Sequence, residues 1–167
     1  MIVVSDSSPL ITLSRAQQLD LLREFYGQVV IPREVDQEVT VAGAGLPGAE
    51  EVRRASWILV QPNPAEIPAA LKDACSGLGT GERNAIYLAL ALNAELVLID
   101  EEKARRAAKS AGLAVAGAIA VLERGARLKI VADLRSVYLS LLDQGVRFDH
   151  KLLEQSLARL GLAKLIS

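Results

Sequence analysis

The chain has 167 residues and a formal net charge of −1; 51% of its residues are apolar and 4% are aromatic. This length suits one domain that buries most of its apolar surface without disulfides or a structural metal. The single cysteine, Cys75, excludes an internal disulfide framework and a cysteine-based zinc site. Because the net charge is close to zero, any contact with phosphate must come from local basic patches or bound cations.

The first residues do not have the features of a signal peptide. The segment Met1–Asp6 lacks a basic region and becomes polar at Ser5. No apolar run approaches the roughly 20 residues needed to span a bilayer. We therefore expect a cytoplasmic protein without a membrane segment.

Strand and helix patterns alternate along the first part of the chain. In order, the pattern predicts a strand at Ile2–Ser5, two short helices within Pro9–Phe25, a strand at Val29–Ile31, a helix opened by Pro32, a short helix at Glu50–Ala55 and a strand at Trp57–Val60. The strands are apolar on both faces, as expected in a sheet that helices cover on both sides. Residues 41–48 and 61–68 are predicted to be mobile loops.

The second part continues the alternation and then becomes helical. The pattern predicts a helix at Gly81–Leu92, a strand at Leu96–Ile99, a helix at Glu101–Ala111 stopped by Gly112, a strand at Leu113–Val115, and helices at Ala118–Arg127, Leu134–Leu142 and His150–Leu160. Such alternation favours a parallel sheet with right-handed crossovers. We interpret residues 1–167 as one domain, with a helical C-terminal extension from about residue 128.

Two of the predicted strands end at an aspartate, Asp6 and Asp100. Ligands of open α/β sheets bind beyond the carboxyl ends of the strands, so neighbouring strands would bring both carboxylates into one crevice. Two carboxylates at such a short separation require a counter-cation or a shared proton. Mg²⁺ or Mn²⁺ suits oxygen ligands. The alternative is that each aspartate caps the helix that follows it.

Two further acidic positions have competing explanations. Glu82 lies in the first turn of its predicted helix, where the helix dipole favours a carboxylate. The glycine-rich segment before it lacks the Lys-Ser/Thr ending of a phosphate loop, so that function is excluded. Glu34 and Glu38 lie one turn apart on one helix face, and the residues alone do not choose between them.

Four segments resemble PIN domains in the order in which that family supplies its acidic residues. They are Ile2–Ile11, Val30–Val39, Gly79–Ala89 and Leu96–Ala107. The segment Gly112–Gly117 and the helical tail resemble an uncharacterised prokaryotic branch related to the VapC-type toxins of toxin–antitoxin pairs. The resemblance implies a three-layer α/β/α fold with a central parallel sheet of about five strands.

The resemblance also implies a ribonuclease that hydrolyses phosphodiester bonds with Mg²⁺ or Mn²⁺. Its acidic ligands would be Asp6, Glu38, Glu82 and Asp100, which selects Glu38 over Glu34. A cation held by carboxylates activates a water as nucleophile, and a second cation can stabilise the leaving oxygen. Such a site needs no catalytic histidine.

Several neighbours of these carboxylates are given supporting roles. Ser8 is expected to hydrogen-bond a ligand carboxylate, with an ordinary turn or cap serine as the alternative. Glu101 stands where this branch often has a second aspartate, and it could still reach a metal ion or its water. Arg83, Lys103 and Arg105 are candidates for phosphate binding, against the alternative of an ordinary solvated helix face.

The implied partners are an RNA substrate, a small antitoxin protein and a second copy of the chain. The main rival is a catalytically inactive PIN-like protein that binds nucleic acid or regulates a partner. A dehalogenase-like phosphatase would need an aspartate where Ser8 stands, and a receiver domain would need a second acidic residue beside Asp6.

Overall fold

A computed structural model describes residues 1–165, and a parallel sheet forms its centre. The strands are β1 (Val3–Ser5), β2 (Val29–Pro32), β3 (Ile58–Gln61), β4 (Leu96–Leu98) and β5 (Val115–Ala116). Their order is β3-β2-β1-β4-β5, and every neighbouring pair is parallel. The predicted sheet of about five parallel strands is therefore confirmed, with strand ends that differ from the prediction by at most two residues.

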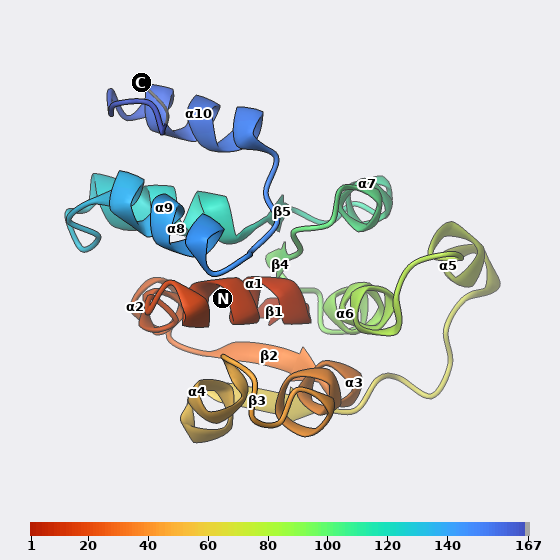
Figure 1. Cartoon of the computed structure of the whole chain (residues 1–167). Helices are drawn as coiled ribbons and strands as arrows, with labels where there is room; N and C mark the ends of the chain where they lie inside the picture. The colour runs from red at the N-terminus through yellow and green to blue at the C-terminus, as the bar shows by residue number, and fades with distance from the viewer. Residues whose placement is uncertain (166–167) are drawn as a thin grey trace.

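Helices cover both faces of this sheet (Figure 1). They are α1 (Ser7–Arg15), α2 (Asp20–Tyr26), α3 (Arg33–Asp36), the π-helical turn η1 (Gln37–Ala42), α4 (Ala49–Arg54), α5 (Ala69–Ala74), α6 (Thr80–Ala91), α7 (Glu102–Ser110), α8 (Ala118–Arg127), α9 (Leu134–Asp143) and α10 (His150–Arg159). Figure 1 shows α1, α2 and α8 on one side of the strands and α6 and α7 on the other. The three-layer α/β/α architecture is confirmed.

Alternate residues of each strand enter two separate apolar cores. Val3, Ile31 and Leu98 belong to the core under α1, α2 and α8. Val4 and Val97 belong to the core under α6 and α7. This alternation follows from the period of two along a β-strand, and it explains why each strand reads as a continuous apolar run.

The last two helices stack on α8 and extend the first of these layers (Figure 1). The Tyr138 hydroxyl of α9 and the Ser156 hydroxyl of α10 share a buried hydrogen bond of 2.6 Å. Arg159 of α10 forms an ion pair with Glu123 of α8. The predicted helical C-terminal part is thus packed against the body by apolar and polar contacts.

Two local features differ from the prediction. Helix α5 has no buried residue, so no apolar stripe announces it in the sequence. The loop predicted from residue 41 begins instead inside η1.

The glycine predicted to stop α7 has the expected conformation. Gly112 follows the C-cap Ala111 and has a φ of 89°. Within residues 1–165, no helix is long and apolar enough to cross a membrane.

Candidate active site

The carboxyl ends of β1 and β4 meet at one edge of the sheet. Ser5 pairs with Leu98 in the parallel register, and the Asp6 N–H donates to the Leu98 carbonyl at 3.0 Å. Asp6 follows β1 and is only 3% exposed, and Asp100 follows β4 after the buried Ile99. The adjacency of the two strands therefore brings both aspartates to the same edge.

Glu38 reaches this edge from the other neighbour of β1. It lies in η1, which follows β2 and α3. A π-helical turn is rare, and such turns recur at functional sites because the wider turn redirects side chains. The Ser7 hydroxyl, at the start of α1, donates a hydrogen bond to Glu38 Oε2. The carboxylate of Glu38 is thus held beside the residue that follows Asp6.

Gly81, in the first turn of α6, is the point at which Asp6 and Glu38 converge. A methyl group at Gly81 would collide with Glu38 Oε2 and lie 2.9 Å from Asp6 Oδ1. The Gly81 backbone is helical, so what glycine provides here is the absence of a side chain and not an unusual φ. Glu34 instead accepts a hydrogen bond of 2.9 Å from the Asn63 amide. The structure therefore brings Glu38, and not Glu34, to Asp6.

The environment of Asp6 is unfavourable to a negative charge. Burial is the main cause that raises the pKa of Asp6 to about 7; the charges of Glu82, Glu38 and Asp100 contribute to this rise, and the Ser7 N–H opposes it. Burial also raises the pKa of Asp100, while the Ala118 N–H and Arg105 lower it. At neutral pH, Asp6 therefore needs either a proton or a cation.

One carboxylate oxygen of Glu82 and one of Asp100 accept hydrogen bonds from backbone N–H groups. Glu82 Oε2 accepts from the Gly79 N–H at 2.9 Å, and Asp100 Oδ1 accepts from the Ala118 N–H, at the start of α8, at 2.7 Å. Within residues 1–165, no group of three or more His, Cys, Asp or Glu side chains is close enough to hold an ion. Asp6 and Glu38 thus form a converging pair, with Glu82 and Asp100 beside it.

This donor set fits a hard divalent cation better than any other group. Asp6 and Glu38 offer only oxygen atoms, and both can lie against Gly81 because it has no side chain. Mg²⁺ is usually bound by one or two carboxylates and keeps several waters, so a complete protein cage is not needed. The set lacks the nitrogen and sulfur ligands that zinc favours.

The residues expected to support the carboxylates have other local roles. Ser8 is exposed and lines a pocket beside Asp100, and the hydrogen bond expected of it is made by its neighbour Ser7. Glu101 caps α7 by accepting from the Ala104 N–H at 2.7 Å. Sequence reasoning also missed Gly81; its place one residue before Glu82 was the available signal.

The three cations expected at phosphates are not gathered in one cluster. Arg83 donates to the Leu78 carbonyl at 3.4 Å, inside the loop before α6. Lys103 is exposed, and its amino group lies against Gly77 in the same loop. Arg105 donates to the Ile99 carbonyl at 3.0 Å, close to Asp100. Arg105 is therefore the one of the three that lies beside a candidate ligand.

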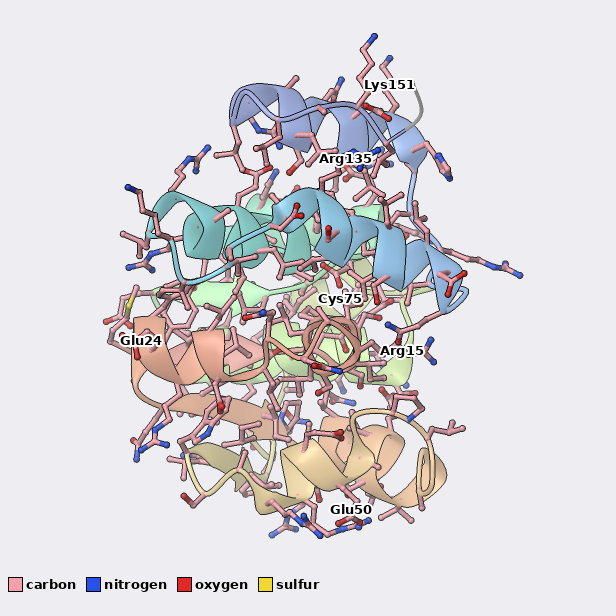
Figure 2. All side chains as sticks on the ribbon, turned by 60° about the vertical axis from the view of Figure 1, so that its left-hand side comes forward. Arg15, Glu24, Glu50, Cys75, Arg135 and Lys151 are labelled. Atoms are coloured by element: carbon pink, nitrogen blue, oxygen red, sulfur yellow. The ribbon has the colours of Figure 1, made fainter. Side chains whose placement is uncertain are left out.

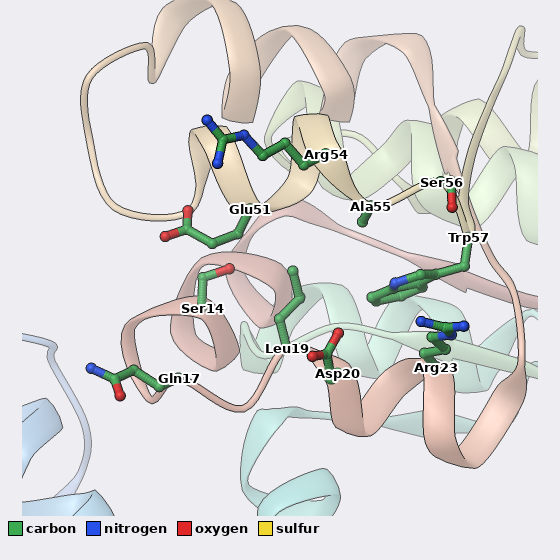
Figure 3. A pocket seen from close by; sticks show the side chains of 10 residues that line it. All are labelled: Ser14, Gln17, Leu19, Asp20, Arg23, Glu51, Arg54, Ala55, Ser56 and Trp57. Carbon is green, nitrogen blue, oxygen red and sulfur yellow. The ribbon is translucent and has the colours of Figure 1, made fainter.

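A separate pocket of about 460 Å³ lies at the opposite edge of the sheet (Figure 3). Ser14 near the end of α1 and Trp57 just before β3 line it, and so do Arg23 and Glu51. The Ser14 hydroxyl is buried without a hydrogen-bond partner. None of the four carboxylates lines this pocket, so it is not part of the candidate site.

Comparison with known proteins agrees with this architecture. No curated protein matches the chain. A family model, DUF3368, described as a PIN domain, matches residues 2–162 and so includes every strand and all four carboxylates. PIN domains are generally nucleases, and they generally use divalent metal ions. The chain belongs to the PIN domain family DUF3368.

Proposed function

We propose that the protein is a divalent-metal-dependent endoribonuclease that hydrolyses RNA phosphodiester bonds. The observation that carries this proposal is the convergence of Asp6 and Glu38 at Gly81. Asp6 is nearly fully buried, and within residues 1–165 no lysine, arginine or histidine forms an ion pair with either carboxylate. The buried Asp6, with the exposed Glu38 beside it and no counter-charge, is unfavourable as an anion unless a cation neutralises it.

In this proposal Asp6, Glu38, Glu82 and Asp100 are the ligands of Mg²⁺ or Mn²⁺, directly or through water. A divalent ion supplies a nucleophile at neutral pH and stabilises negative charge on the reacting phosphate. Ser7 orients Glu38, since it donates to one carboxylate oxygen. The Ala118 N–H does the same for Asp100.

The test is cleavage of a mixed single-stranded RNA pool by the purified protein in Mg²⁺ or Mn²⁺, and in EDTA. The matched variant is Asp6→Asn, which keeps the shape of the side chain and removes its charge. We expect metal-dependent cutting that falls by about a thousandfold or more in Asp6→Asn, because several kcal/mol of charge stabilisation are lost. Full cleavage by a folded Asp6→Asn protein would remove this site assignment.

The catalytically inactive alternative makes a different prediction in the same experiment. A folded protein that binds Mn²⁺ or RNA, but cuts nothing in either metal, would be a binding or regulatory protein. Single-stranded DNA of the same sequences, assayed in parallel, determines whether RNA is the preferred substrate.

The proposed biological setting is the toxin of a toxin–antitoxin pair, with a small antitoxin and a second copy of the chain as partners. Segment Gly112–Gly117 and the helical tail resemble a PIN branch that is related to VapC-type toxins, and this relation supports the antitoxin. The exposed Leu152 and Leu162, in α10 and just beyond it, support self-association because they leave apolar surface in water. Light scattering after gel filtration would reject the dimer if only monomer mass appears at micromolar concentration.

A further inference from the structure

A groove of about 600 Å³ begins at Asp100 and runs toward the C-terminal extension. Ser8 and Thr12 of α1 line one wall, and Asp100 and Arg105 line the end nearest the candidate site. The other walls come from α8 and from residues 146–149, which connect α9 to α10. Of the four candidate carboxylates, the groove thus reaches Asp100, and residues of the C-terminal extension form part of its wall.

Four acidic groups that line this groove are already engaged with donors. Glu123 is paired with Arg159 and lies 3.7 Å from Arg127. Glu101 and Asp149 cap the helices α7 and α10. The fourth, Glu102, lies 3.6 Å from Arg106. The ion pairs of Glu123 and Glu102 therefore reduce the charge that these two carboxylates present to a ligand.

The three arginines that line the groove differ in whether they already have a partner. Arg159 is occupied by Glu123, and Arg105 is held at the Ile99 carbonyl beside Asp100. Arg147 is exposed, and its guanidinium has no hydrogen bond or ion pair with any residue in the described chain, 1–165. Arg147 is therefore the cation at the groove that an incoming anion can pair with directly.

The groove also has an apolar side. Ile119, Phe148 and Leu152 line it, and Phe148 packs half-buried against the main core. An aromatic ring that the core holds in place is a suitable stacking surface for a base, because every base has a π-face. A cation next to an aromatic ring is the combination that single-stranded nucleic acid binds.

We propose that this groove binds the nucleotide next to the cleaved phosphate of a single-stranded substrate, with Arg147 at a backbone phosphate and Phe148 against the base. This inference rests on the proposed function, since it takes the carboxylate site as the place of cleavage. It gives the C-terminal extension a role in substrate binding in addition to its packing on α8.

The experiment measures binding separately from cleavage. A fluorescein-labelled single-stranded RNA of about 10 nucleotides is titrated, by anisotropy in Mg²⁺, against full-length protein carrying Asp6→Asn so that the strand stays intact. Arg147→Ala, Phe148→Leu and Lys151→Ala are compared in this background, from about 50 to about 200 mM salt. Lys151→Ala is the matched control, because Figure 2 shows Lys151 extending from α10 into solvent and it does not line the groove.

We expect Arg147→Ala to weaken binding about fivefold and to reduce the slope of log K against log salt by about 0.7, the value for one phosphate contact on a single strand. Phe148→Leu keeps an apolar side chain in the core and loses the ring, so we expect a loss of about fivefold or more with an unchanged salt slope. Lys151→Ala should leave both quantities unchanged. Thermal melting confirms that each variant is folded.

Equal affinities for Arg147→Ala and Lys151→Ala would overturn the inference, as would unaltered binding by a folded Phe148→Leu protein. If Arg147→Ala and Phe148→Leu both bind RNA with the affinity of the parent, the groove does not bind RNA. A segment of a protein partner is then the occupant to test. A parent that binds no RNA also overturns the inference. If the wild type binds RNA through Arg147 and yet cuts nothing in Mg²⁺ or Mn²⁺, the proposed catalysis fails and the groove assignment remains.

Discussion

Asp6 and Glu123 are both nearly fully buried carboxylates, 3% and 6% exposed, but their surroundings are opposite in charge. Glu123 lies between two helices and is neutralised by Arg159 and by Arg127. Asp6 lies at the carboxyl edge of the sheet, and the charged groups that raise its pKa are three other carboxylates. One buried acid is thus neutralised within the protein, whereas the other has no cationic partner among residues 1–165 and needs a proton or a cation.

The difference separates an acid that is neutralised inside the protein from the acid that we propose as a metal ligand. A paired carboxylate fixes the position of α10 on α8, and it requires nothing from the solvent. An unpaired group of carboxylates lowers the stability of the empty protein, and it gains stability when a cation binds. The protein keeps this unfavourable arrangement at the edge of the sheet where open α/β folds bind their ligands.

The largest expected effect is that replacing each buried carboxylate by the corresponding amide changes the free energy of unfolding in opposite directions. In EDTA at pH 8, Glu123→Gln should lower the free energy of unfolding by about 1–2 kcal/mol, because the half-exposed Arg159 loses its partner. Asp6→Asn should raise it by about 1 kcal/mol, because a charge is removed from a buried site. Urea unfolding of both variants measures the two values. If both variants are destabilised, the contrast between the two acids is wrong.

The second prediction concerns the close approach of Asp6 and Glu38 to Gly81. Gly81→Ala should lower cleavage or Mn²⁺ affinity about 30-fold, since its methyl group displaces both carboxylates. Gly79→Ala, at the residue before α6, is the matched control, because a methyl group there would lie 3.4 Å from Glu82 Oε2 and fit with little movement. The measurements are calorimetric Mn²⁺ titration and initial cleavage rates. Equal values for the two variants would show that Gly81 does not shape the site.

The third prediction is a pH dependence of opposite sign for stability and for metal binding. The pKa of Asp6 is about 7 in the folded protein against an ordinary value of 3.8, so between these values the folded state holds a proton that the unfolded chain has lost. In EDTA, the contribution of Asp6 to stability should fall as the pH rises from about 4 to about 7.

Metal binding should show the reverse trend, because the cation displaces that proton. Mn²⁺ affinity should drop about tenfold per pH unit below about pH 7 and level off above it. Calorimetry at pH 6, 7 and 8 measures the affinity, and thermal melting in EDTA measures the stability. An affinity that is constant from pH 6 to pH 8 would contradict the raised pKa.

The smallest expected effect distinguishes two adjacent serines. Ser7→Ala should weaken Mn²⁺ binding about fivefold, since Glu38 loses its hydrogen bond of about 1 kcal/mol. Ser8→Ala should have less effect, because Ser8 is exposed at the mouth of the groove. The two affinities, measured at one pH, determine which serine orients the carboxylate.

The sequence alone determined the alternation of strands and helices, the position of Asp6 and Asp100 at strand ends, and the helical C-terminal part; the adjacency of β1 and β4 came from the structure. Buried parallel strands read as apolar runs because helices cover both faces, and aspartates at the ends of such runs stand out against them. The same local logic missed α5, which buries none of its residues and so leaves no apolar pattern. It also could not choose between Glu34 and Glu38 without the family resemblance.

Only the tertiary structure decided which groups meet. Glu38 approaches Asp6 from a π-helical turn that follows α3, and a regular helical period does not predict that turn. Ser7 rather than Ser8 holds Glu38, and Gly81 provides the space, through contacts between β1, η1 and α6. The groove between Asp100 and Phe148 joins residues that are far apart in the chain. Sequence patterns report each element's own buried face, whereas the side chains that face one another depend on how the elements pack.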